Sequence, residues 1–148
     1  MSLDEYKKKR DFGKTPEPAG SESISGEARF VVQKHQARQL HYDFRLEMEG
    51  VLKSWAVPKG LPLDTGIRRL AVQVEDHPVS YIDFSGTIPN GEYGAGTVDI
   101  WDSGNYTIEN ITDETIEIVL SGNILSGRYV LVHTDGKNWL VMKRRDIS

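Results

Sequence analysis

The 148-residue sequence carries 18 basic and 22 acidic side chains, a formal charge of −4, and no cysteine. This length fits one domain that can bury a core without disulfides or a structural metal. The acidic balance argues against a protein that coats long stretches of nucleic acid, because such binding needs many phosphate contacts, but it leaves open the capture of a strand end by a few local cations. With no long apolar run and no signal-like N-terminus, we expect a cytoplasmic protein that does not bind membranes.

Residues 1–28 differ in composition from the rest of the chain. They combine Gly, Pro, Ser and charged residues with few large apolar ones, and they contain the basic run Lys7–Arg10. Composition alone is typical of a solvated tail. We therefore expect an N-terminal arm over residues 1–28 that is partly flexible and contributes to the site described below, followed by a folded β-barrel domain over residues 29–148.

Short strand-like segments follow one another from residue 28 onward. In chain order they are residues 28–35, 41–49, 51–57, 69–77, two within 97–108 joined by a turn at 102–105, and three within 116–144. The last two turn at Asp135-Gly136, a strong hairpin signal. Helix signals are scarce, with at most one short turn at 112–117. The pattern predicts an all-β fold, a compact closed or partly open β-barrel of short antiparallel strands.

An ordered set of polar side chains interrupts this pattern. In a strand over 41–46, His41, Asp43 and Arg45 share one face, and the other face carries Tyr42, Phe44 and Leu46. His35 lies six residues before His41 and returns to the same place if the chain turns between them. Two imidazoles and one carboxylate form a three-point metal set with open positions, suited to Mn²⁺, Fe²⁺ or Zn²⁺ better than to Ca²⁺.

Further charged groups would complete a site for phosphate chemistry. Arg45 offers a planar fork for two phosphate oxygens, although a salt bridge is an equally simple role. Glu75 and His77 share a face of a later strand and join the same site if the strands are neighbours. Glu75 could then act as a base or orient a ligand.

Two other functions fit parts of the pattern. A non-haem iron oxygenase would use His41, Asp43 and His133, followed by Arg144 or Arg145, but the chain is short for that barrel and His133 directly precedes a turn. A non-catalytic module that binds nucleic-acid ends would use the same basic groups without needing a metal with open positions.

Four motifs in order resemble the 3′-phosphoesterase domain of bacterial DNA ligase D and its stand-alone archaeal relatives. They are QKH-x5-HYDFR, LKSWAVPKG, VEDHP followed by Tyr81, and IP-x-GEYG-x-G. The resemblance runs from about Tyr6 to Arg144. It implies a compact β-barrel enzyme that cleaves a terminal ribonucleoside from a primer strand, then removes the remaining 3′-phosphate to leave a 3′-OH.

The resemblance also implies a cofactor, partners and residue roles. The cofactor would be Mn²⁺, with Co²⁺ or Zn²⁺ as alternatives, and the substrate a DNA or RNA-tipped primer–template 3′ end. Partner proteins would be a DNA ligase, a polymerase or a Ku-type end-joining protein. His35, His41 and Asp43 match metal ligands, and Arg45 and His77 match groups that engage the phosphate. The surrounding shell would contain Gln33, Lys59, Glu75 and Tyr81, and the arm would contribute Arg10, Asp11 and Glu17.

Overall fold

The computed structural model describes residues 3–18 and 28–145, and the regular secondary structure within them is almost entirely β-strand. One α-helix, α1 (Asp4–Lys8), and one 3₁₀ helix, η1 (Val79–Asp83), occur in this part of the chain. Neither is a long apolar helix of the kind that crosses a membrane. The strands are β1 (Arg29–Gln36), β2 (Leu40–Met48), β3 (Val51–Val57), β4 (Arg68–His77), β5 (Gly86–Ile88), β6 (Gly96–Ile111), β7 (Thr115–Gly122), β8 (Ser126–Asp135) and β9 (Asn138–Lys143).

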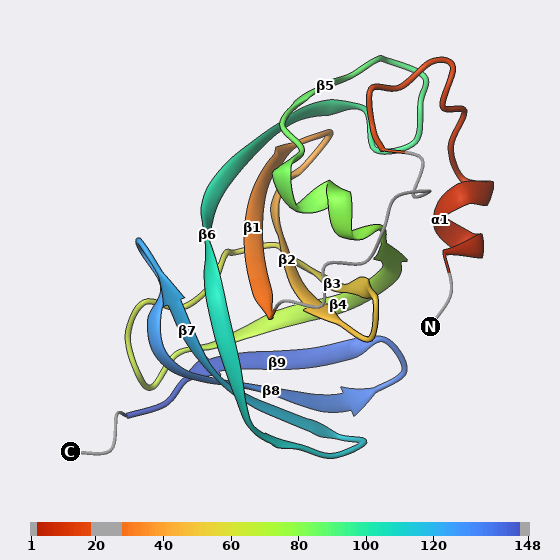
Figure 1. Ribbon diagram of the computed structural model, residues 1–148. Helices are drawn as coiled ribbons and strands as arrows, with labels where there is room; N and C mark the ends of the chain where they lie inside the picture. Colours follow the sequence, from red (N-terminus) through yellow and green to blue (C-terminus); the bar gives the residue numbers. More distant parts are fainter. Residues whose placement is uncertain (1–2, 19–27, 146–148) are drawn as a thin grey trace.

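The strands form a closed antiparallel barrel (Figure 1). The sheet order is β1-β2-β3-β4-β9-β8-β7-β6-β5, and the additional pairing of β1 with β6 closes a ring of eight strands. β5 adds to the edge of β6 through residues 86–88. The predicted all-β barrel is therefore confirmed.

The barrel wall is apolar on both faces in its first strands. Phe30, Phe44, Leu46, Trp55 and side chains from the five other ring strands form the core inside the barrel. Outside the wall, a second cluster joins Val31, Leu52 and Val98 of the barrel to Tyr6 of α1 and to apolar residues of η1 and β5. Because β2 alternates, Asp43 and Arg45 point to this outer face. The polar set therefore lies on the outside of the wall, beneath the segments that cover it.

Part of the N-terminal arm is one of these covering segments. Tyr6 is fully buried, and Glu17 is 4% exposed. Figure 1 shows α1 and the chain after it beside the barrel, close to the loop between β5 and β6. The solvated-tail interpretation is thus wrong for residues 3–18, because composition does not reveal which single side chains are buried. Residues 1–2 and 19–27 of the expected arm lie outside the described residues.

Two local predictions from the sequence are also wrong. The turn expected at 102–105 does not exist, because β6 continues from Gly96 to Ile111 and passes from β1 to β7 at this point. A Cβ on Gly104 would come within 2.1 Å of the Ser121 carbonyl oxygen, so the glycine permits close strand contact. The helical turn expected at 112–117 is instead the end of a hairpin, where Thr112 Oγ1 accepts the N–H groups of Glu114 and Thr115.

A β-bulge in β4 decides which face its last residues occupy. Ser54 pairs with Val74, and Leu52, two residues earlier on β3, pairs with His77, three residues later on β4. The extra residue moves His77 onto the outer face shared by Leu52 and Ser54. Regular alternation would have left His77 on the face of Ala71, inside the barrel.

Candidate active site

A cavity of about 340 Å³ lies between the outer face of the barrel wall and the segments that cover it. It brings together side chains from β1, β2, β4, η1 and the arm. Of the residues predicted for the site, those that line it are Arg10, Glu17, His35, His41, Asp43, Arg45, Glu75, His77 and Tyr81.

The three predicted metal ligands lie together at the ends of β1 and β2. His35 and His41 are direct cross-strand partners, and Asp43 follows on the same face. His35 Nδ1 is 3.4 Å from Asp43 Oδ2, and His41 Nε2 is 3.3 Å from Asp43 Oδ1. One candidate ligand atom from each residue lies within 4.8 Å of the others, and no other such group occurs among the described residues.

Backbone carbonyls determine which ring nitrogen of His35 and of His41 carries the proton when the imidazoles are neutral. His35 Nε2 lies 2.7 Å from the Gly94 carbonyl oxygen, and His41 Nδ1 lies 3.2 Å from the Gln39 carbonyl oxygen. A carbonyl only accepts, so these nitrogens donate and carry the ring protons. The unprotonated nitrogens, His35 Nδ1 and His41 Nε2, then face Asp43. This arrangement of outer hydrogen bonds around inward lone pairs is typical of metal-binding histidines, and the three residues fit a divalent metal.

The charges of this group reinforce one another. Burial opposes ionisation of Asp43, but the Arg45 charge, together with the hydrogen bonds that His35 and His41 donate when the nitrogens facing Asp43 are protonated, holds the pKa of the carboxyl below its usual range. The hydrogen bond to Asp43 raises the pKa of His41. Asp43 is therefore a carboxylate, the form that binds metals.

Arg45 is held rigidly beside the carboxylate. Its Nε donates to Gln33 Oε1 at 2.7 Å, its Nη2 lies 3.5 Å from Asp43 Oδ2, and its guanidinium carbon lies 4.8 Å from the centre of the Tyr81 ring. Gln33 is itself fixed by donating to the carbonyls of Tyr81 and Phe84. Among the described residues, the buried Nη1 of Arg45 has no hydrogen-bond partner.

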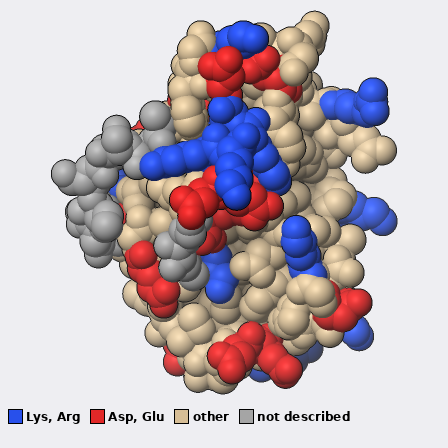
Figure 2. All heavy atoms as spheres, turned by 90° about the vertical axis from the view of Figure 1, so that its right-hand side faces the viewer, with Lys and Arg blue, Asp and Glu red and all other residues tan. Residues whose placement is uncertain are grey.

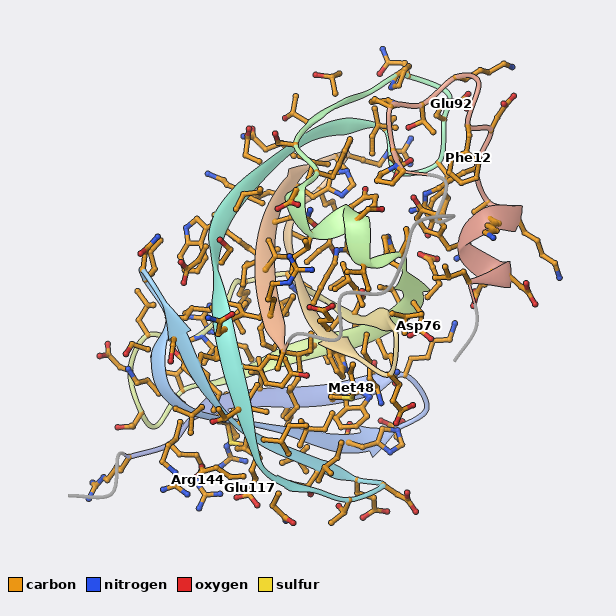
Figure 3. The ribbon with its side chains drawn as sticks, viewed as in Figure 1. Phe12, Met48, Asp76, Glu92, Glu117 and Arg144 are labelled. Atoms are coloured by element: carbon orange, nitrogen blue, oxygen red, sulfur yellow. The ribbon has the colours of Figure 1, made fainter. Side chains whose placement is uncertain are left out.

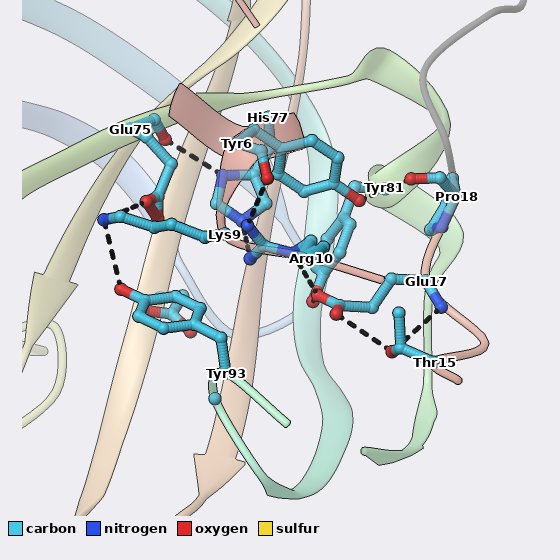
Figure 4. A network of polar contacts seen from close by, with 12 residues as sticks. Tyr6, Lys9, Arg10, Thr15, Glu17, Pro18, Glu75, His77, Tyr81 and Tyr93 are labelled. Carbon is cyan, nitrogen blue, oxygen red and sulfur yellow. Dashed lines mark hydrogen bonds and ion pairs between the residues drawn. The ribbon is translucent and has the colours of Figure 1, made fainter. Parts of the chain in front are cut away.

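The arm contributes a second guanidinium through a buried network (Figure 4). Arg10 donates from Nε to Glu17 Oε2 at 3.0 Å and from Nη1 to the Tyr6 carbonyl at 3.1 Å. Glu17 also accepts from the hydroxyls of Thr15 at 2.9 Å and Tyr81 at 2.7 Å. Glu17 is thus a buried anchor that fixes Arg10 at the cavity.

His77 connects this network to β4. Its Nδ1 lies 2.9 Å from the Glu75 carbonyl, and its Nε2 lies 3.3 Å from Arg10 Nη2. Because both the carbonyl and the guanidinium have fixed roles, Nδ1 donates and Nε2 accepts, which is the neutral imidazole. Burial, followed by the charges of Arg45 and Arg10, lowers the pKa of His77 well below its ordinary value. In this arrangement His77 positions Arg10.

Glu75 contacts Lys9 of the basic run, and Lys9 in turn contacts Tyr93, a residue for which the sequence predicted no role. Lys9 Nζ donates to Glu75 Oε2 at 2.8 Å and to the Tyr93 hydroxyl at 3.4 Å, and the first contact raises the pKa of Lys9. Figure 3 shows the arm, labelled at Phe12, on the same side of the barrel as the loop labelled at Glu92, which carries Tyr93. In the sequence, Lys9 lies in the basic run Lys7–Arg10 and Tyr93 lies in the GEYG motif. These two patterns are the features that could have marked both residues as part of the site.

Other residues singled out in the sequence lie outside the cavity lining, among them the fully buried Gln33 behind Arg45. Lys59 is exposed in the loop after β3, and Asp11 is exposed in a turn where it accepts the N–H of Gly13 at 3.0 Å. His133 is the third ligand of the oxygenase alternative. Its Nε2 lies 2.8 Å from the carbonyl oxygen of Gly136 in its own hairpin, and it is absent from the metal-type group. The roles of Lys59 and Asp11 remain predictions.

Comparison with known proteins places the same residues in one family. A family described as "DNA Ligase D 3'-phosphoesterase domain" matches residues 33–133. The chain is 51% identical over 156 residues to "Multifunctional non-homologous end joining protein LigD" of Pseudomonas aeruginosa, across 97% of this chain and 19% of that protein. Proteins of the same name from Mycobacterium bovis and Mycolicibacterium smegmatis are each 49% identical across 97% of the chain, which covers 20% and 21% of their length. The chain therefore spans about a fifth of the length of the curated relatives it matches.

Proposed function

The chain belongs to the DNA ligase D 3′-phosphoesterase domain family, and from this premise we propose that it is a metal-dependent enzyme that heals DNA 3′ ends. It would cleave the terminal ribonucleoside from a primer strand to leave a 3′-phosphate, and then hydrolyse that phosphate to leave a 3′-OH. Water adds to phosphorus in the second step, the bond to the 3′ oxygen breaks, and that oxygen takes up a proton.

One observation carries the proposal beyond family membership. Within the described part of the chain, the buried Arg45 Nη1 has no acceptor, although the rest of its guanidinium is fixed beside the His35–His41–Asp43 group. A buried donor without a partner costs about 1–3 kcal/mol, so a site that retains one is suited to an incoming acceptor. A phosphate oxygen is the acceptor that a guanidinium fork fits best.

The same arrangement supports metal dependence. His35, His41 and Asp43 would hold the ion, and Mn²⁺ is the cofactor we propose, with Co²⁺ or Zn²⁺ as alternatives, because the donor set mixes imidazole and carboxylate. A bound divalent ion would supply charge neutralisation at the phosphate and a water of lowered pKa.

The chain's own residues then have separable tasks. Arg45 binds a phosphate oxygen through Nη1, with Gln33 and Tyr81 holding its orientation. Arg10 brings a second guanidinium to the cavity, with Glu17 and His77 holding it. Donors positioned in advance stabilise the charge that develops on a phosphate during transfer. Glu75 holds Lys9 at the cavity mouth, where an ammonium could meet a strand's backbone phosphate.

The end-joining context of the relatives suggests partners for this domain. Their names describe multifunctional end-joining proteins, of which this chain matches about a fifth. We propose that it works on primer–template 3′ ends together with a DNA ligase, a polymerase or a Ku-type end-joining protein.

A labelled oligonucleotide tests the proposal. A 5′-labelled primer annealed to a template and ending in one ribonucleotide is incubated with the protein and Mn²⁺, and the products are separated by size. We expect a 3′-phosphate product first and a 3′-OH product later, with neither formed in excess chelator. Tight binding without product would instead support the non-catalytic end-binding module and contradict enzymatic healing.

A further inference from the structure

We propose that Tyr93 forms a nucleobase-stacking subsite at the mouth of the cavity and binds the base of the terminal nucleotide. This inference rests on the proposed function, because it takes the ligand to be a nucleic-acid 3′ end. It assigns a role to a residue that neither the metal group nor the phosphate-binding groups use.

The ring is available to a ligand. Tyr93 is 48% exposed and is the one aromatic residue among the exposed large hydrophobic side chains of the described chain. It also lines the cavity that holds His35, Arg45 and His77. An aromatic ring that is both partly solvated and part of a polar cavity offers a flat surface to a planar ligand.

The surroundings of the ring suit a nucleotide. Lys9 Nζ lies 4.9 Å and Arg10 Cζ lies 5.3 Å from the centre of the Tyr93 ring. Figure 2 shows Lys and Arg side chains gathered on the face of the molecule that carries α1. A base stacked on the ring would keep its flanking phosphates near these cations, which is the combination found in single-strand binding grooves.

The position of Tyr93 is tied to the metal-type group. The following residue, Gly94, has φ +76°, a left-handed conformation that favours glycine, and its carbonyl accepts the His35 Nε2 proton at 2.7 Å. Lys9 fixes the other end of the side chain by donating to its hydroxyl at 3.4 Å (Figure 4). The ring is therefore fixed at the edge of the same cavity that Arg45 and the metal-type group line, where one nucleotide would contact both.

The test compares binding of a primer end that carries its terminal base with binding of the same end without that base. Fluorescence anisotropy in excess chelator measures the Kd of two primer–templates, one ending in a normal ribonucleotide and one ending in the same ribose without its base. Stacking is worth about 1–3 kcal/mol per base, so we expect the wild type to bind the normal end about 5- to 150-fold more tightly. Tyr93→Ala should erase this preference, Tyr93→Trp should keep it, and Tyr93→Leu should lose most of it although it remains large and apolar.

The possible outcomes separate the two proposals. A wild-type preference for the base that Tyr93→Ala leaves intact overturns the subsite, and so does equal binding of both ends by the wild type. A preference that depends on Tyr93 supports the subsite even if Mn²⁺ yields no product, and in that case the enzymatic proposal alone fails. Leu63→Ala, which removes a side chain that is 52% exposed away from the cavity lining, serves as the matched surface control and should bind as the wild type does.

Discussion

Replacing Glu17 with alanine should release the N-terminal arm from the barrel while the barrel stays folded. The Glu17 carboxylate accepts hydrogen bonds from Arg10, Thr15 and Tyr81 and is almost fully buried. The core inside the barrel contains no residue of the arm, so its packing does not depend on this contact.

The loss of docking free energy in Glu17→Ala follows from the buried charge that the substitution leaves without a partner. The Arg10 side chain is 5% exposed and would lose its only ion-pair partner among the described residues. Removing one member of a buried ion pair costs about 3–5 kcal/mol, because the other charge stays buried and uncompensated. At 1.4 kcal/mol for each factor of ten, the docking equilibrium of the arm should fall by about 10²- to 4 × 10³-fold.

Hydrogen exchange of residues 3–10 and turnover of the labelled primer measure the effect. Both the protection of the arm and the rate of product formation should drop together, with little change in the melting temperature of the barrel. Glu5→Ala removes a carboxylate from the same arm whose exposed ion pair with Lys9 is 3.4 Å long, and such pairs contribute about 0–1 kcal/mol. Wild-type arm protection and turnover in Glu17→Ala would refute the anchoring role of Glu17.

Three further predictions concern positioning, stability and pH. Gln33→Met should lower kcat by about 10²-fold with little change in KM, because Arg45 loses the acceptor of its Nε; unchanged kcat in steady-state assays would contradict this role. Asp102→Asn should lower the free energy of unfolding by about 1.5–3 kcal/mol in urea melts, since the buried carboxylate accepts the backbone N–H groups of residues 123–125. Burial, followed by neighbouring guanidinium charges, lowers the pKa of His77 below 6.5, so the unfolded chain binds more protons and stability should fall as pH drops below about 6.5. His77→Gln should flatten this dependence in melts at pH 7.5 and 5.5, and an unchanged slope would contradict the assignment.

The metal-type group could be predicted from spacing because it is almost entirely local. His41 and Asp43 are two residues apart on one strand, and the short connection between β1 and β2 makes His35 the direct partner of His41. If both segments are strands, alternation places the three side chains together. The alternating apolar residues Phe44 and Leu46, which face the barrel core, predict the strand.

The positions of the other site residues could not be predicted from the alternation of apolar and polar residues. His77 reaches the outer face through a β-bulge in β4, and a bulge leaves no mark in a sequence of alternating residues. The arm docks through the buried Tyr6 and Glu17, two residues within a segment of mainly polar composition. The sequence around Gly104 predicted a turn, but the absence of a side chain there instead allows β6 and β7 to approach closely. These long-range contacts required the fold or the family resemblance.

The most direct test of the central claim is a Mn²⁺ titration of product formation from the ribonucleotide-ended primer. It compares the wild type with Asp43→Ala and with His133→Ala, which removes a histidine outside the metal-type group. Product formation should require Mn²⁺ in the wild type and in His133→Ala, and it should be lost in Asp43→Ala at all Mn²⁺ concentrations while the circular dichroism stays that of a folded β-protein. Near wild-type turnover in folded Asp43→Ala would contradict the assignment of His35, His41 and Asp43 to the catalytic metal.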